Sequence, residues 1–250
     1  NALVATFDLS TIEPDPLQLV RLWSEPRDQE VAGLIAAAFA YGRADIIVAN
    51  VGALLERMVP SPAAYLDSFD EREARCRFAG FSHRFQKTGE LVAFFAAIAR
   101  VLSSHGSLSA LFREVYDESD ADIGPSLARF TSHLAPIGAP RSQALRHLVT
   151  SPDDGSACKR MNLFLRWMVR RTEPDLGLWT FVDPAKLVIP LDTHVHRIST
   201  FLGLSDRRSP DWKAARAITD QLARFDPADP VRYDFALARL GILDLCSRKR

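Results

Sequence analysis

The spacing of apolar residues at intervals of three and four is the feature that most restricts how this chain folds. The clearest example follows Thr88 and consists of Leu91, Val92, Phe94, Phe95, Ile98 and Leu102. This spacing places apolar side chains on one face of a helix. The sequence has no strong alternating pattern of four or more residues, which a half-buried strand would require. We therefore predict an all-α fold.

Residues that commonly cap helices mark where several of the predicted helices begin. Asp15-Pro16 combines a cap with proline at the first helical position. Asp28 is expected to open a central helix that Gly42 ends, and Ser156 to cap a helix that runs to Arg170. Residues 70–87 are charged and rich in arginine, and they predict a loop with a poorly defined helix.

Charge is unevenly distributed along a chain whose formal net charge is zero. Residues 1–140 hold 12 Lys and Arg against 18 Asp and Glu, a net charge of −6, whereas residues 141–250 hold 19 against 13, a net charge of +6. Such an asymmetry is expected when one part of a protein binds a polyanion. Because it also arises by chance, it favours nucleic-acid binding only modestly.

Two further features of the sequence bear on its cellular compartment. No apolar run reaches the roughly 18 residues of a membrane span, and the first residues do not resemble a signal peptide. The three cysteines, Cys76, Cys158 and Cys246, are odd in number and far apart, which argues against a disulfide framework. We therefore expect a cytoplasmic protein with no membrane partner. We further expect a monomer with no metal and no cofactor.

The segment from Gly155 to Leu165 carries the first candidate for chemistry. With Ser156 as the cap, Lys159 falls in the first turn of the helix, beside Arg160. The positive end of the helix dipole and a neighbouring cation both lower the cost of the neutral amine. A neutral lysine amine is a nucleophile. The alternative is a solvated lysine on a capped helix.

The second candidate segment surrounds Asp192. Pro190-Leu191-Asp192-Thr193 is a helix entry, with Asp192 as the cap that backbone N–H groups hold ionised. Asp192 with His194 and His196 also suggests a metal cluster. However, residues two apart on a helix face different sides, which disfavours metal binding.

Together the two segments resemble the helix-hairpin-helix superfamily of DNA glycosylases. In that superfamily a Gly-x-Gly-x-Lys hairpin opens a helix with a catalytic lysine, and a later Val-Pro-x-Asp-x-His segment carries a catalytic aspartate. Gly155 and Lys159 match the hairpin, and residues 189–194 match the second segment. The separation of 33 residues between Lys159 and Asp192 is similar to that in the archaeal 8-oxoguanine glycosylase branch.

A narrower resemblance covers the whole chain. The strings Ser156-Ala157-Cys158-Lys159-Arg160 and Pro190-Leu191-Asp192-Thr193-His194, with Tyr233-Asp234-Phe235-Ala236-Leu237, resemble a bacterial family known only as a domain of unknown function. The hairpin departs from the glycosylase pattern, because Ala157 replaces the second glycine and Asp153 and Asp154 precede the first. Two acids disfavour contact with a DNA phosphate.

The glycosylase resemblance implies a two-lobed helical bundle with a cleft between the lobes. Residues 29–150 would form a central lobe, and residues 1–28 with 151–250 a second lobe that carries the site. The implied activity is excision of an oxidised purine from double-stranded DNA, with Lys159 attacking C1′ and Asp192 assisting, followed by cleavage at the abasic site. The protein would be associated with the nucleoid when bound to DNA.

Other residues are assigned to binding roles on the same basis. Candidates for contacting the damaged base are Gln29, Tyr41, Arg43, Phe164, Trp167 and His194. Candidates for contacting DNA phosphates are Gly155, Ser156, Arg160 and Arg197. Most of these residues have an ordinary alternative role in core packing, in capping or on a solvated basic surface.

Three other functions are consistent with the sequence. A non-catalytic nucleic-acid-binding protein would keep the fold and lack the reaction. A metal-dependent hydrolase would use Asp192, His194 and His196. A structural interaction module is a third alternative, for which no residue pattern speaks.

Overall fold

The computed structural model describes residues 6, 9–135 and 143–242, and these residues are mostly helical, as predicted. The α-helices are α2 (Leu17–Val20), α3 (Pro26–Ala38), α4 (Ala44–Leu55), α5 (Pro62–Asp67), α6 (Glu71–Arg77), α7 (Thr88–His105), α8 (Leu108–Val115), α9 (Gly124–His133), α10 (Gln143–Leu148), α11 (Lys159–Val169), α12 (Thr193–Phe201), α13 (Trp212–Ala223) and α14 (Asp234–Ile242). Short 3₁₀ helices are η1 (Leu9–Thr11), η2 (Pro152–Asp154), η3 (Pro184–Lys186) and η4 (Pro230–Tyr233). The strands β1 (Ser82–His83) and β2 (Gln86–Lys87) pair in an antiparallel hairpin.

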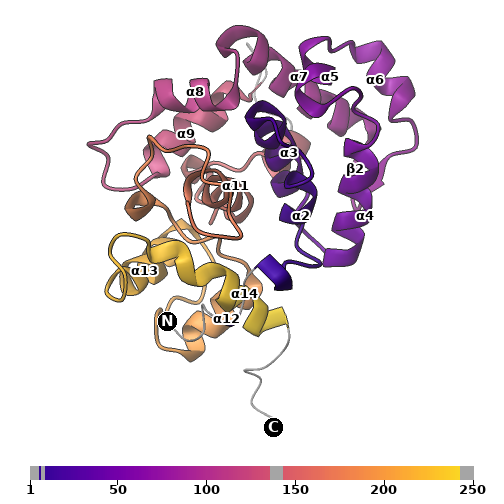
Figure 1. Cartoon of the computed structure of the whole chain (residues 1–250). Helices are drawn as coiled ribbons and strands as arrows, with labels where there is room; N and C mark the ends of the chain where they lie inside the picture. Colours follow the sequence, from indigo (N-terminus) through magenta and orange to yellow (C-terminus); the bar gives the residue numbers. More distant parts are fainter. Residues whose placement is uncertain (1–5, 7–8, 136–142, 243–250) are drawn as a thin grey trace.

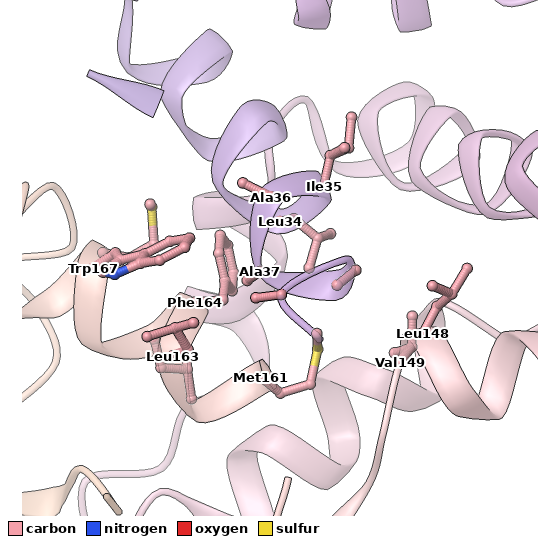
Figure 2. Close-up of a cluster of buried hydrophobic side chains, with 14 of the residues drawn as sticks. Leu34, Ile35, Ala36, Ala37, Leu148, Val149, Met161, Leu163, Phe164 and Trp167 are labelled. Atoms are coloured by element: carbon pink, nitrogen blue, oxygen red, sulfur yellow. The ribbon is translucent and has the colours of Figure 1, made fainter. Parts of the chain in front are cut away.

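Helices α3 and α11 pack against each other at the centre of the molecule (Figure 1). A glycine on α3 allows this close approach, because a Cβ atom at Gly33 would lie 2.8 Å from Cε of Met168 and 3.5 Å from Phe164. Figure 2 shows Phe164 and Met161 on α11 next to Ala37 and the end of α3. The two helices thereby share one apolar core.

The remaining helices surround this pair. Helices α5 and α8 both contact α3 and α7, and α9 contacts α8. At the other end of the chain, α12 packs against α14, and α13 packs against η4. In Figure 1 these late elements, drawn in orange and yellow, lie on the side of α11 away from α5 to α7. The arrangement leaves the N-terminal ends of α11 and α12 close together.

A buried carboxylate connects α3 with later segments. Glu30 accepts hydrogen bonds from Nε1 of Trp179 at 3.0 Å and from the backbone N–H of Ser109 at 3.1 Å. Burial raises the pKa of Glu30, and these two hydrogen bonds oppose the shift. Because the partners lie far apart in sequence, the carboxylate fixes α8 and the loop after α11 relative to α3.

The predicted start of α3 was wrong. The helix begins at Pro26, with Glu25 as its N-cap, and it ends at Ala38, before Gly42. Asp28 lies inside the first turn, and its Oδ1 accepts a hydrogen bond from the backbone N–H of Ala63 at 2.8 Å. The carboxylate therefore caps the neighbouring helix α5 instead of its own, which local sequence does not reveal.

The prediction of a loop with a poorly defined helix over residues 70–87 was wrong in part. Asp70 caps a defined helix, α6, by accepting from the backbone N–H of Glu73 at 2.6 Å. The β1–β2 hairpin follows, and Arg84 in its turn has a positive φ of 54°. Strands of two residues are too short to produce an alternating pattern, and arginine is not a residue that signals such a turn.

Within the described part of the chain, no single helix has the length and apolar character required to cross a membrane. The helices α7 and α8 meet the criterion only as a pair bent by 72°.

The fold predicts different consequences for two phenylalanines. Phe164 is completely buried between α3 and α11, whereas Phe225 is 71% exposed. Replacing Phe164 with alanine leaves a cavity, so we expect Phe164→Ala to lower the free energy of unfolding by about 3–5 kcal/mol. Phe225→Ala is the matched control, with an expected change within about 0.5 kcal/mol. Denaturant unfolding of both variants measures the difference, and equal losses would contradict the assignment of Phe164 to the core.

Candidate active site

The start of α11 is formed by an unusual backbone conformation. Cys158 is the N-cap residue and adopts a left-handed conformation with φ of 50°. Ser156 is not the cap that the sequence predicted, because α11 begins only at Lys159; its Oγ instead accepts from the backbone N–H of Cys158 at 3.1 Å in the turn before the helix. Lys159 is nevertheless the first residue of the helix, so its predicted place in the first turn is confirmed. Burial raises the pKa of the Cys158 thiol to about 12, which keeps it protonated.

Asp192 caps α12, as predicted. Its Oδ1 accepts from the backbone N–H groups of His194 at 2.9 Å and Val195 at 2.8 Å. Its second oxygen, Oδ2, lies 3.9 Å from Nζ of Lys159. One oxygen therefore fixes the carboxylate on the helix while the other is directed towards the amine.

The amine of Lys159 has a second partner at the end of α3. Nζ donates a hydrogen bond to the backbone carbonyl oxygen of Ala40 at 2.9 Å. The side chains of Lys159 and Asp192 are 30% and 26% exposed, so both remain accessible to a ligand. The amine is thus held between the segment after α3 and the N-terminus of α12.

The two side chains line a cavity of about 680 Å³. This volume lies within the range of about 300–1,000 Å³ that is usual for small-molecule sites. The lining comes from residues 14–16, residues 40–44, residues 190–195 and one side each of α11 and α14, together with Ile47, His147 and Pro210. The cavity therefore forms where segments from both halves of the chain meet.

A network of buried charges forms part of the lining. Arg166 donates to Asp175 at 3.1 Å and to Asp234 at 2.5 Å, and Arg170 pairs with both Asp175 and Asp229. Arg166 and Asp234 also line the cavity. Burial raises the pKa of Asp234 to about 6, Arg166 opposes this shift, and the negative charge of Asp192 adds to it.

Half of the predicted site residues lie together around the cavity. The residues that line it are Tyr41, Arg43, Lys159, Arg160, Asp192 and His194. Arg43 is highly exposed at the rim, where it forms an ion pair with Asp45 at 2.7 Å. Arg160 is buried, and its guanidinium lies 5.1 Å from the centre of the Tyr41 ring.

The other predicted site residues do not line the cavity. Gln29 donates to the backbone carbonyl of Trp23 at 2.7 Å. Phe164 and Trp167 are completely buried, and the Phe164 ring lies 5.3 Å from that of Trp179. The candidates Gly155, Ser156 and Arg197 also lie outside the cavity lining.

The segment between η2 and α11 contacts a later segment. Ser156 forms an isolated antiparallel bridge with Asp211, and the backbone N–H of Trp212 donates to the carbonyl oxygen of Gly155 at 3.4 Å. Arg197 is exposed on α12.

Several lining residues were not assigned to the site from the sequence, among them His147 on α10 and Asp234 at the start of α14. The string from Tyr233 to Leu237 contains Asp234, but nothing in it assigns a role to this residue. A single histidine on a short helix gives no signal that sequence reasoning can use.

The arrangement of the acids and histidines does not favour the metal-dependent alternative. In the described residues, no group of three or more His, Cys, Asp and Glu side chains converges as a metal site. His194 faces the cavity, whereas Nε2 of His196 lies 2.9 Å from the backbone oxygen of Arg207.

Fold and site together define a helical protein with a lysine and a carboxylate in a ligand-sized cavity. Residues 15–243 match the family model described as "Protein of unknown function (DUF2400)", and the chain therefore belongs to this family. No curated protein and no solved structure matches the chain.

The environment of His147 predicts a specific dependence of stability on pH. Burial, with the charges of Arg160 and Arg84, lowers the pKa of His147 to about 4. In the unfolded chain, His147 binds a proton near pH 6.5, which is about the ordinary pKa of histidine. The contribution of His147 to the free energy of unfolding is therefore fully present above about pH 6.5. It decreases as the pH falls towards 4, because the unfolded state then binds more protons than the folded state.

Replacing His147 with glutamine should remove the part of the pH dependence of stability that comes from this histidine. We expect the melting temperature of the wild-type protein to fall more between pH 7 and pH 5 than that of His147→Gln. Thermal unfolding of both proteins at several pH values measures the difference. Parallel pH profiles would show that the folded protein binds this proton as readily as the unfolded chain.

Proposed function

We propose that this protein is a DNA glycosylase that excises an oxidised purine of the 8-oxoguanine type and cleaves the resulting abasic site. The observation that carries the proposal is the distance of 3.9 Å between the Lys159 amine and the Asp192 carboxylate inside a cavity of about 680 Å³. An amine beside a carboxylate in a cavity that accommodates a nucleobase suits nucleophilic attack on a sugar carbon.

The proposed substrate is double-stranded DNA whose damaged nucleotide rotates out of the helix into the cavity. Nζ of Lys159 forms a bond to C1′ while the C1′–N9 bond breaks, and the base leaves with the bonding electrons and takes up a proton. Asp192 stabilises the positive charge that develops on the sugar and accepts a proton from the amine.

The second step follows from the covalent bond to Lys159. Opening of the sugar ring transfers the C1′–O4′ bonding electrons to O4′, which takes up a proton, and leaves a Schiff base between C1′ and Nζ. Loss of a proton from C2′ then expels the 3′ phosphate by β-elimination. The carboxylate of Asp192 is held for this chemistry by its two backbone hydrogen bonds.

The distribution of the lining supports a two-lobed arrangement of the glycosylase type. Residues 40–44 and His147 belong to the proposed central lobe, 29–150. Residues 14–16 and 190–195 belong to the proposed second lobe, 1–28 with 151–250. The cavity then corresponds to the cleft between the lobes.

Contacts to the base are proposed for three of the predicted residues. Tyr41, Arg43 and His194 line the cavity and are positioned to contact an occupant. Gln29, Phe164 and Trp167 are assigned instead to packing and backbone hydrogen bonds. On the surface, Gly155, Ser156 and Arg197 remain the proposed contacts to phosphates of the duplex, and the protein acts as a monomer.

Reductive trapping tests the nucleophile directly. Incubation with borohydride and a duplex that contains 8-oxoguanine or an abasic site should link the wild-type protein covalently to DNA. Lys159→Ala should form no adduct, because it lacks the amine. If the wild-type protein forms none, the proposed mechanism is wrong; if Lys159→Ala forms one, the nucleophile is another residue.

The two roles of Asp192 are separable by substitution. Asparagine is as good an N-cap as aspartate, so Asp192→Asn should change the free energy of unfolding by less than about 0.5 kcal/mol. Asp192→Ala should lower it by about 0.5–2 kcal/mol, because it removes the cap. Both variants should excise the base about 100-fold more slowly, because neither has the carboxylate.

Asp70→Asn is the matched control. Asp70 caps α6 in the same way, with a hydrogen bond of 2.6 Å from the backbone N–H of Glu73, and it does not line the cavity. We expect its excision rate to equal that of the wild type. A wild-type rate for Asp192→Asn in single-turnover assays would show that Asp192 acts only as a helix cap.

A further inference from the structure

Among the described residues, Arg160 is a buried cation without an acidic partner. It is 8% exposed and lines the cavity, and no carboxylate in the described part of the chain forms an ion pair with it. Its contacts are a hydrogen bond of 3.3 Å to the carbonyl oxygen of Ala38 and the face of the Tyr41 ring. The buried Arg166 and Arg170, by contrast, each pair with two carboxylates.

This absence of a partner is energetically unfavourable. Burial lowers the pKa of Arg160 to about 10, so the side chain still carries its charge at neutral pH. Buried charges are normally paired, because removing them from water costs several kcal/mol. As far as the structure describes the chain, the cavity therefore has an uncompensated positive charge on one part of its wall.

His147 adds a second polar group to the same part of the wall. Its Nε2 is buried and has no hydrogen-bond partner among the described residues, although the side chain lines the cavity. Its ring lies 4.8 Å from that of Tyr41, which also contacts Arg160. A cation and an unused imidazole nitrogen thus both lie next to one tyrosine.

The N-terminus of α11 contributes to the same positive region. Its first turn contains no acidic residue, and no side chain caps it. The positive end of the helix dipole favours an anion at this position. The planar guanidinium of Arg160 suits an oxyanion with two oxygens to offer, as in a phosphate group.

The acidic residues of the cavity lie on other elements. Asp15 lies just before α2, Asp192 is at the start of α12 and Asp234 is at the start of α14. Lys159 connects the two regions, because its amine contacts both Ala40, which adjoins Tyr41, and Asp192. An anion would therefore be favoured near Arg160 and disfavoured near Asp192.

We propose that Arg160 and His147 form an oxyanion subsite inside the cavity that holds the phosphate adjoining the flipped nucleotide. The assignment to DNA rests on the proposed function. With the phosphate at this subsite, the attached sugar extends past Lys159 towards Asp192. The subsite would thus position C1′ for attack by the amine.

Removal of a single phosphate charge from the DNA tests the subsite. The probe is a duplex with a tetrahydrofuran abasic analogue, made either with natural phosphates or with one neutral methylphosphonate on the 5′ or 3′ side of the analogue. Because a hydrogen bond between charged groups is strong, we expect one of these substitutions to weaken wild-type binding about tenfold or more, measured by fluorescence anisotropy. Arg160→Gln should bind that duplex and the natural one equally well.

Two further variants keep the test decisive if Arg160→Gln does not fold, which thermal unfolding would show. His147→Gln should reduce the effect of the methylphosphonate, and Arg160→Lys should retain part of it. Arg75→Gln, which removes an exposed charge on α6, is the matched control and should show the full wild-type effect. Wild-type binding that is insensitive to both methylphosphonates, or an undiminished effect in Arg160→Gln and His147→Gln, would overturn the proposal.

The binding assay also separates this proposal from the proposed reaction. The tetrahydrofuran analogue cannot form a Schiff base, so binding does not depend on Lys159 chemistry. A phosphate effect without borohydride trapping would support the subsite and contradict the glycosylase. Covalent trapping without a phosphate effect would support the glycosylase and contradict the subsite. Failure to bind either duplex would overturn the assignment to DNA, and protection of the folded protein by inorganic phosphate would then identify a free phosphate as the ligand.

Discussion

The close packing of α11 against α3 determines where the chemistry-bearing groups lie. At Gly33 the two helices approach so closely that a Cβ atom would meet the end of Met168. The same contact brings the start of α11 to the end of α3, where Lys159 reaches the carbonyl oxygen of Ala40 and Arg160 that of Ala38. Without this contact neither cation would be directed into the cavity.

Helix capping gives the second fixed point of the site. One oxygen of Asp192 is used by two backbone N–H groups, and these bonds orient the other oxygen towards Lys159. A side chain that is free to rotate would otherwise lose entropy on being ordered in a cavity. Because the cap already orders the carboxylate, a ligand binds to a preorganised group.

The buried arginines of this protein differ in whether they have a carboxylate partner. Arg166 and Arg170 are neutralised by carboxylates from distant segments, and that network holds α14 and the loop after α11 against the core. Arg160 has no such partner in residues 9–135 and 143–242, although it too is largely removed from solvent. The first two residues thus serve the fold, and the contrast supports the proposal that Arg160 binds a ligand.

The sequence by itself determined the helical content, the place of Lys159 in the first turn of its helix and the helix start at Asp192. These depend on apolar periodicity and on capping groups within a few residues, so they are encoded locally. Local signals failed at Asp28, because its side chain bonds to the neighbouring helix α5, and at Ser156, because the left-handed conformation of Cys158 delays the start of α11 to Lys159. The tertiary structure alone decided three features of the site. These are the distance between Lys159 and Asp192, the unpaired charge of Arg160 within the described residues, and the presence of His147 in the cavity. Each depends on contacts between segments far apart in the chain. No local pattern in the sequence predicts the side-chain packing that creates those contacts.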